Sequence, residues 1–483
     1  MNNTRQLSGS SPQLLLWVLG ITILISIYGA IAFQSVLPLF IAPAVLLAML
    51  AISDYKWLYY MLFPLIPMSV GIYLSNGLGT DLPVEPLMAA LTLVTLAIVF
   101  VKYKEIDSRF FLHPLSLLLF LHLSWILFTT LMAEDLMIAI KFTLAKTWYI
   151  LPFYVLTLLV IKRQKQFVNI IWLLILALGW FIPLVLFRHA SHGFSFFSSN
   201  FVLTPFFSNH VAYGTLLVVI LPFVVLQYYF YRRNQILSLF LLFGIVLFLV
   251  AIYFSYVRIA MGAIVIGLGA FFMFRLKLTK YFIIIGLGIA SYFVIHMIQS
   301  DNYLAYAPSY EKTISHKEFD DVLGATVKGE DLSTMERVYR WVAGYYMIKE
   351  KPLTGFGPGN FYSTYRPYTV SSFRPYVSDN PERSGIHSYY LMTAVEQGLP
   401  GLFIFLLLVL YSLLKVEKLY HSLADSKDRL IILSAGVSLV IIYVILILND
   451  MIEHIKIGPF FFLILGLIVI MDVRGGLDKI GEE

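Results

Sequence analysis

The sequence predicts an all-α polytopic integral membrane protein. Hydrophobic residues make up 59% of the 483 positions and charged residues only 13%, whereas soluble domains carry roughly 25% charged residues. The mean hydropathy is +0.83, so no soluble core accounts for this chain. Long apolar runs, such as 14–31 and 460–470, have apolar residues on every side. They lack the alternation of a β-barrel, which favours spanning helices.

The apolar runs predict about 12–14 transmembrane helices, because roughly 20 apolar residues are needed to cross a bilayer. The run that starts at 137 has an alternative interpretation. Lys141 and Lys146 interrupt its apolar pattern, which would also suit an interfacial amphipathic segment over 135–146. The predicted helices cover residues 13–33, 36–53, 57–74, 84–101, 113–132, 137–161, 167–187, 210–230, 236–254, 259–274, 281–298, 388–414, 430–449 and 457–472.

Four segments follow from this pattern. Residues 1–200 hold the N-terminal transmembrane helices and 201–298 the central ones. Residues 299–387 form one large extramembrane loop with short helices, and 388–483 hold the C-terminal transmembrane helices. A polar insert of this size needs a reason other than crossing the bilayer, so we expect the chemistry in and just beyond this loop.

The basic connectors predict the orientation. Those at 162–165, 232–233, 275–280 and 415–429 all fall on one side of the membrane, which places both termini in the cytoplasm and the large loop in the periplasm or its equivalent. The first run lacks a cleavage-type end, so we expect it to be retained. The pI of 9.0 then reflects orientation rather than nucleic-acid binding. The absence of cysteine excludes disulfides, thiolate metal sites and cysteine nucleophiles.

A glycine-rich stretch, Pro-Leu-Thr-Gly-Phe-Gly-Pro-Gly-Asn, occupies residues 352–360 of the loop. Gly355, Gly357 and Gly359 with Pro358 specify a tight turn, and the backbone N–H groups of such a turn can hold an anion. The alternative is an ordinary surface turn that binds no anion.

His387 stands where the polar loop gives way to an apolar helix, so its ring can meet both an aqueous acceptor and a lipid-borne donor and act as a base. Glu396 is a second candidate, because a carboxylate in an apolar run is costly unless it is satisfied. It lies about 13 Å along a continuous helix from His387, so direct pairing is not expected. Gly398 and Gly401 flank Pro400 and should kink or interrupt this helix.

Four arginines are candidates for binding an anion. Arg258 lies between two apolar runs, where a charge is costly unless it is at the interface or in a polar cavity. Arg337 and Arg340 lie on an expected amphipathic helix, and Arg188 borders an outer connector. Snorkelling or a solvated helix face is the plain alternative for each. The irregular spacing of the nearby histidines does not match a metal site, and we expect neither metal nor cofactor.

Several of these residues resemble the motifs of a known protein family. His387-Ser388, nine residues and Gly398-Leu-Pro-Gly401 resemble the His-[Asn/Ser/Gln]-x9-Gly-x-x-Gly signature of the O-antigen ligase family. Arg337-x-x-x-Trp341 and the stretch 352–361 resemble a domain of the same family that also occurs in O-antigen polymerases. The resemblance covers about residues 200–450. One departure is Leu402-Phe-Ile, where ligases often have small hydroxyl residues.

The resemblance implies a metal-independent, inverting glycosyltransferase of the bacterial inner membrane. Its donor would be a glycan on undecaprenyl diphosphate, its acceptor a lipid or glycan, and its surroundings membrane lipids, with no nucleic-acid partner. It assigns Arg258 and Arg337 to the diphosphate, with Arg340 and Arg188 in reserve, because the guanidinium fork binds phosphate oxygens. It assigns His387 to the acceptor hydroxyl.

Ligation of the glycan to lipid A core or another surface acceptor is the favoured interpretation. Polymerisation of an O-antigen or exopolysaccharide is the first alternative, and transfer of an oligosaccharide to protein the second. A small-anion transporter is a weaker alternative, because few ionisable residues lie at the centre of the apolar runs, where a transport route would need them.

Overall fold

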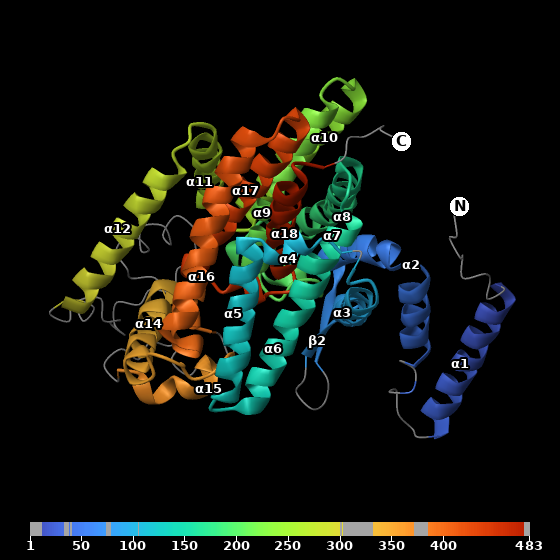
Figure 1. Ribbon diagram of the computed structural model, residues 1–483, viewed down its shortest axis with the longest axis horizontal. Helices are drawn as coiled ribbons and strands as arrows, with labels where there is room; N and C mark the ends of the chain where they lie inside the picture. Colours follow the sequence, from blue (N-terminus) through green and yellow to red (C-terminus); the bar gives the residue numbers. More distant parts are fainter. Residues whose placement is uncertain are drawn as a thin grey trace.

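The computed structural model describes residues 12–32, 38, 41–73, 79–104, 106–299, 302, 332–370 and 385–477, and over these ranges the chain is a bundle of helices (Figure 1). This confirms the predicted all-α polytopic class. Among the described residues, ten helices are long and apolar enough to cross a membrane: Val84–Val101, Pro114–Leu131, Leu136–Val160, Gln164–Ala190, His210–Tyr231, Gln235–Phe254, Arg258–Arg275, Thr279–Ile298, Tyr389–Ser422 and Ser426–Leu448.

The elements follow in chain order. The first half comprises α1 (Pro12–Ala32), α2 (Ile41–Met68), β1 (Val70–Tyr73), β2 (Gly79–Leu82), α3 (Val84–Val101), α4 (Ser108–Leu112), α5 (Pro114–Leu131), α6 (Leu136–Ile150), a π-helical turn (Leu151–Leu156), α7 (Thr157–Val160) and α8 (Gln164–Ala190). Two 3₁₀ turns (Phe196–Ser198 and Phe201–Leu203) precede α9 (His210–Tyr231), α10 (Gln235–Phe254), α11 (Arg258–Arg275) and α12 (Thr279–Ile298). The last part comprises α14 (Leu332–Glu350), α15 (Phe361–Thr364), α16 (Tyr389–Ser422), α17 (Ser426–Leu448), a 3₁₀ turn (Met451–Glu453) and α18 (Gly458–Arg474).

The expected helices at 36–53 and 57–74 form a single broken element, α2. The break is at Asp54, whose φ of −154° and ψ of 82° are not helical. Its carboxylate accepts from the N–H groups of Lys56 and Trp57, at 3.1 and 3.4 Å, which caps the second half of α2 as a new helix start.

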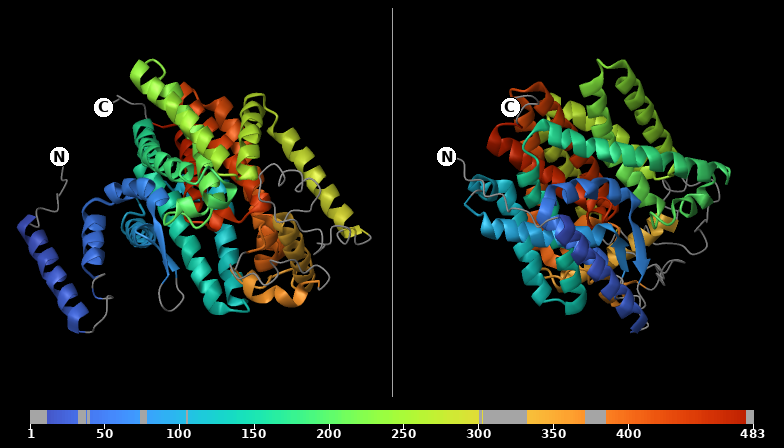
Figure 2. Two further views of the ribbon diagram at one scale, coloured as in Figure 1. Left: turned by 180° about the vertical axis from the view of Figure 1, so that it is seen from behind. Right: turned by 90° about the vertical axis from the view of Figure 1, so that its right-hand side faces the viewer.

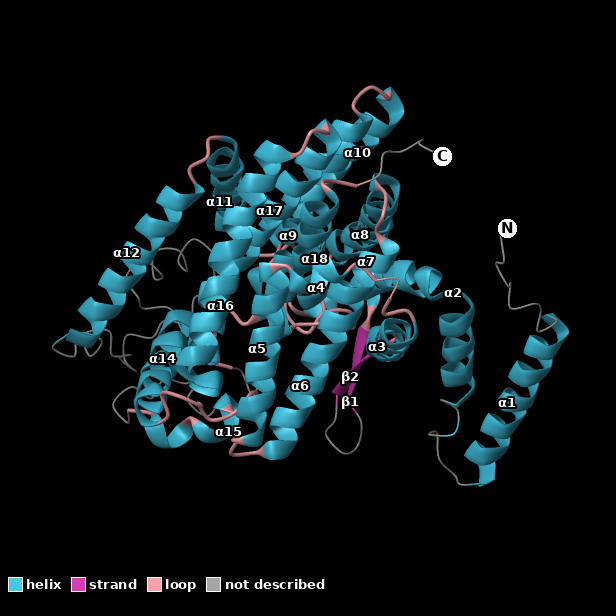
Figure 3. Cartoon of the chain, in the orientation of Figure 1, coloured by secondary structure: helices cyan, strands magenta, loops and turns pink. Residues whose placement is uncertain are grey.

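The prediction of helix as far as residue 74 was wrong. The chain leaves α2 at Met68 and forms the antiparallel hairpin of β1 and β2, in which Val70 pairs with Leu82 (Figure 3). A contact from far along the chain stabilises this helix end. The buried ammonium of Lys456 donates to the carbonyls of Ile66 and Ser69, at 2.7 and 2.9 Å, and satisfies the end of α2 as basic side chains do at helix C-termini.

Helix α18 forms the centre of the bundle. It is apolar on every face, and its residues from Gly458 to Met471 are all buried, as expected for a helix without a polar stripe. Gly466 allows close packing, because a Cβ there would lie 3.1 Å from the Tyr154 carbonyl oxygen. By contrast α12 lies at the edge of the bundle (Figure 1), and only Thr279 at its start is buried.

The two ends of the bundle can be told apart from the antiparallel pair α9 and α17. Ser438 donates to the Val219 carbonyl at 2.7 Å near the middle of both helices, and Lys427 lies 5.9 Å from the Phe230 ring at one end. The other end therefore holds the start of α9 and the end of α17. There the N–H of Tyr389 donates to the Asn449 carbonyl at 3.2 Å, so α16 also starts at this end. We call it the His387 end, and the opposite one the Arg275 end.

Helices α14 and α15 lie outside the bundle at the His387 end, beside the start of α16 (Figure 2). They belong to the segment 299–387, which the sequence predicts as the large loop with short helices. Residues 303–331 and 371–384 of that segment lie outside the described ranges.

Candidate functional site

The Gly398–Gly401 stretch breaks α16, which confirms the expected kink. Gly398 has φ 71° and ψ 177°, a combination that is essentially confined to glycine. The break frees the N–H of Leu399 to donate to the Pro352 carbonyl at 2.8 Å. A Cβ on Gly398 would overlap the Leu353 carbonyl oxygen. The two glycine motifs of the sequence are therefore in direct contact.

The glycine-rich turn at 352–360 binds the carboxyl group of Glu396 through its backbone N–H groups. Gly355, Gly357 and Gly359 have φ values of 67°, 97° and 76°, which aim successive N–H groups toward α16. Gly359 and Phe361 donate to the two oxygens of Glu396, at 2.8 and 3.2 Å. The N–H groups that the sequence suggests as an anion site are therefore engaged by a side chain of the protein itself.

Two backbone hydrogen bonds complete the contact between the glycine-rich turn and α16, which we call the glycine brace. Phe356 donates to the Val395 carbonyl at 3.0 Å, and Gly357 to the Glu396 carbonyl at 2.9 Å. Because both carboxylate oxygens of Glu396 are engaged and its exposed fraction is 2%, its bonds hold the loop on α16.

Gly401 has a separate reason to be small. A Cβ there would lie 3.1 Å from Trp125 of α5. The indole of Trp125 donates to the Gln397 carbonyl at 2.8 Å, and His122 of α5 bonds the Gln397 amide oxygen at 2.9 Å. The kinked turn of α16 is thus fixed from the side of α5 as well.

His387 lies immediately before α16, as predicted. Its φ is +57°, a left-handed conformation that is uncommon for residues other than glycine and needs support from its surroundings. The support comes from α14. Trp341 donates to the Ile386 carbonyl at 3.0 Å and Arg340 to the Gly385 carbonyl at 2.8 Å. The His387 side chain keeps 25% of its surface exposed, so it is held in place and still accessible.

Glu336 is the acidic partner of His387. Its carboxylate oxygen lies 3.8 Å from His387 Nε2 and forms an ion pair with Arg340, one helical turn along α14. Burial raises the pKa of Glu336, but the adjacent His387 and the positive charges of Arg340 and Arg337 outweigh burial and lower it below its ordinary value. Glu336 is therefore an ionised carboxylate beside an imidazole, the arrangement that orients a general base.

The four predicted arginines differ in their surroundings. Arg340 is 1% exposed and engaged as above. Arg188 donates to the Thr204 carbonyl at 2.8 Å and so ties the end of α8 to the connector before α9. Arg337 is half-buried on α14 next to Glu336, and Arg258 is half-buried at the start of α11. Arg188, Arg258 and Arg337 thus each keep part of their surface exposed, whereas Arg340 does not.

The turn before Arg258 is fixed by aromatic rings. Tyr256 packs against Phe196 and His189, with ring centroids 5.6 and 6.0 Å apart, and its hydroxyl donates to the Phe194 carbonyl. A Cβ on Gly214, near the start of α9, would lie 2.8 Å from Val257, so α11 also starts at the His387 end. Arg258 and His387 therefore lie at the same end of the bundle.

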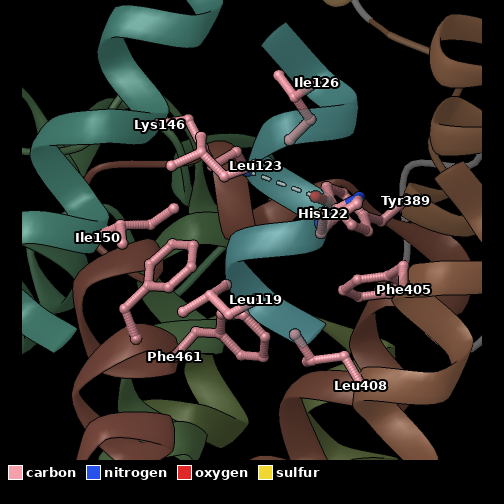
Figure 4. A pocket seen from close by; sticks show the side chains of 11 residues that line it. Leu119, His122, Leu123, Ile126, Lys146, Ile150, Tyr389, Phe405, Leu408 and Phe461 are labelled. Atoms are coloured by element: carbon pink, nitrogen blue, oxygen red, sulfur yellow. Dashed lines mark hydrogen bonds between the residues drawn. The ribbon is translucent and has the colours of Figure 1, made fainter. Parts of the chain in front are cut away.

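A buried polar cluster that the sequence pattern does not indicate lies under the first turn of α16. Lys146 of α6 forms an ion pair with Glu453 and lies 3.4 Å from the Tyr389 hydroxyl. With His122, Lys146 and Tyr389 line a small cavity (Figure 4). The helix of Lys146 continues to Val160 as one candidate span, which favours the spanning interpretation over the interfacial alternative for 135–146. A charge inside a membrane bundle needs such a partner.

The helices and the site residues together define a polytopic helical membrane protein with a basic, histidine-containing site at one end. Residues 243–406 match the family model described as O-antigen ligase. The matched stretch begins within α10 and includes Arg258, Glu336, His387 and the glycine brace. The match confirms the resemblance to the O-antigen ligase superfamily, whose members are glycosyltransferase-type ligases and polymerases. Searches of curated proteins and of solved structures each found no significant match.

Proposed function

We propose that the protein is an inverting, metal-independent glycosyltransferase that moves a glycan from undecaprenyl diphosphate to an acceptor hydroxyl. The contact of His387 with Glu336, inside the stretch that matches the O-antigen ligase model, is the observation that carries this proposal. The reaction takes place at the periplasmic face of the bacterial inner membrane, with both termini in the cytoplasm. The acceptor is lipid A core or another surface acceptor.

His387 acts as the general base in this mechanism. Its Nε2 faces Glu336, which leaves Nδ1 for the acceptor hydroxyl. The acceptor oxygen attacks the anomeric carbon, its proton passes to Nδ1, and the bond from that carbon to the diphosphate oxygen breaks with its electron pair. Glu336 stabilises the imidazolium that forms, and attack opposite the leaving group inverts the anomeric centre.

Arg258 and Arg337 bind the departing diphosphate. A diphosphate is already a good leaving group, so the enzyme has mainly to screen its growing charge and position the acceptor. Arg340 holds Glu336 and the Gly385 carbonyl, and Arg188 holds the connector at Thr204. We therefore assign Arg340, Arg188 and Glu396 to positioning rather than to contact with the donor.

Glu336→Gln should lower kcat by about 10–100-fold with little change in KM, because the amide keeps the size of the side chain but cannot stabilise the imidazolium. Glu350→Gln removes a carboxylate from the exposed end of the same helix and is the matched control. Steady-state glycan transfer by the purified variants is the measurement. Equal kcat values for Glu336→Gln and Glu350→Gln would exclude the orienting role.

The glycan profile of cells tests the function as a whole. In cells lacking the gene, we expect undecaprenyl-linked glycan to accumulate and the mature surface glycan to disappear, and wild-type protein to restore both. Surface glycan reduced to single repeats would instead identify a polymerase. Loss of glycan from a protein, with lipid-linked surface glycan unchanged, would identify an oligosaccharyltransferase. A normal profile in the deletion strain would overturn the proposal.

A further inference from the structure

A large groove lies at the Arg275 end of the bundle, away from the His387 site. It has a volume of about 620 Å³ and runs between α9, α11 and α17. Val218, Ile264, Gly267 and Ile441 line it near the middle of these helices. Tyr229 and Arg275 line it near the ends of α9 and α11, and Tyr420 lines it near the end of α16. A cavity of this size is in the range of small-molecule binding sites, roughly 300–1,000 Å³.

The two parts of the groove differ in chemistry. The part near the middle of the helices is formed by aliphatic side chains of helices that are apolar enough to span a membrane, so water has no partners there. The outer part is lined by Arg275 and two tyrosines. The groove is therefore shaped for a molecule with a long apolar part and an anionic or polar head.

Further positive charge surrounds this opening. Arg275 lies 5.1 Å from the Phe271 ring, Arg232 lies 5.8 Å from the Tyr229 ring, and Lys427 of α17 lies 5.9 Å from the Phe230 ring. All three cations are exposed. Three basic side chains around the opening of an intramembrane groove favour an anionic lipid headgroup, at about 1 kcal/mol for each Lys or Arg near the surface.

We infer that the groove binds one anionic glycerophospholipid, with an acyl chain between α9, α11 and α17 and its phosphate on Arg275. The guanidinium fork suits a phosphodiester, and the tyrosines lie at the level where amphipathic rings meet headgroups. The inference rests on these helices spanning the membrane and is independent of the proposed reaction. In the proposed orientation the lipid belongs to the cytoplasmic leaflet.

The donor's polyprenyl chain is the other lipid to consider. Its charged end would lie at the His387 end, where Arg258 is found, and its free end carries no charge. It would leave the basic opening at Arg275 without a partner, so the charges favour a phospholipid that enters from the Arg275 end.

Native mass spectrometry of the full-length protein tests the inference. The delipidated protein would be offered phosphatidylglycerol, phosphatidylethanolamine and undecaprenyl phosphate in competition. We expect one phosphatidylglycerol per chain to be retained in preference to the other two. Equal retention of phosphatidylglycerol and phosphatidylethanolamine, or displacement of phosphatidylglycerol by undecaprenyl phosphate, would overturn the inference.

Two variants probe the two parts of the groove. Ser434→Trp places a large ring in the groove, since Ser434 lines it, and should reduce lipid retention at least tenfold. Gly269→Trp adds the same bulk to α11 where a Cβ would meet nothing within 4 Å, and should leave retention unchanged. Arg275→Gln keeps the groove open and should reduce the preference for phosphatidylglycerol about fivefold. Wild-type selectivity in Arg275→Gln would contradict the assigned headgroup contact even if Ser434→Trp failed to fold.

Discussion

Replacing His387 with alanine is expected to reduce glycan transfer by about 10²–10⁴-fold, the usual contribution of a positioned base. The structure allows a sharper variant. His387 has a φ of +57°, and asparagine adopts this conformation more readily than most residues. His387→Asn should therefore keep the backbone between Gly385 and Ser388 and remove only the base. We expect it to be as inactive as the alanine variant.

Purified wild type, His387→Asn and His387→Ala would be compared for transfer from a lipid-linked glycan and for thermal unfolding. His192→Ala is the control, because His192 is an exposed histidine in the connector after α8. The expected pattern is loss of transfer in both His387 variants, full transfer in His192→Ala, and a melting temperature near that of wild type in His387→Asn. Substantial transfer by His387→Asn would show that His387 is a structural residue and not the base.

Gly398→Ala is expected to destabilise the protein by about 2–4 kcal/mol. Alanine at φ 71° and ψ 177° is strained, and such conformations cost about 1–3 kcal/mol. Its Cβ would also overlap the Leu353 carbonyl oxygen and separate Leu399 from Pro352. Leu399 and Pro352 are both exposed, so loss of the backbone bond between them adds only about 0.5–1.5 kcal/mol, and the two contributions together give about 2–4 kcal/mol.

Thermal unfolding in detergent would measure this effect, with Gly262→Ala as the control. Gly262 lies on α11, where an added Cβ meets nothing within 4 Å, and alanine in a helix is favoured over glycine by about 1 kcal/mol. We expect a clear decrease in melting temperature for Gly398→Ala and none for Gly262→Ala. Equal melting temperatures would mean that the bond between Leu399 and Pro352 does not hold the loop.

The sequence predicted the spanning helices well because their signal is local. An apolar run of sufficient length must be helical in lipid whatever its neighbours are. The prediction was wrong after Met68, where the chain turns into the hairpin of β1 and β2. That end is stabilised by the ammonium of Lys456, nearly four hundred residues away, and no local pattern contains such a contact.

In the candidate site, too, the local features could be predicted from the sequence and the long-range contacts could not. His387, Gly398 and the glycine-rich turn could be singled out from their residue types and spacing, and so could an anion nest. That Glu396 engages the N–H groups of the turn could not be predicted, because it requires the break at Gly398 to bring the loop against α16. Glu336 was missed although a signal was present. Its spacing of four from Arg340 on a helix is typical of an ion pair, and such a pair next to a candidate base indicates an orienting role.

The brace between Glu396 and the glycine-rich turn has a consequence for how the chain enters the membrane. A carboxylate inside an apolar helix resists insertion until its oxygens are satisfied. The N–H groups that satisfy Glu396 belong to Gly359 and Phe361, which leave the ribosome before it. The donors can thus already be on the far side of the membrane when α16 arrives. Stable insertion of α16 is then coupled to delivery of the preceding loop, so a deletion within 352–360 should impair assembly of the C-terminal helices as well as the site.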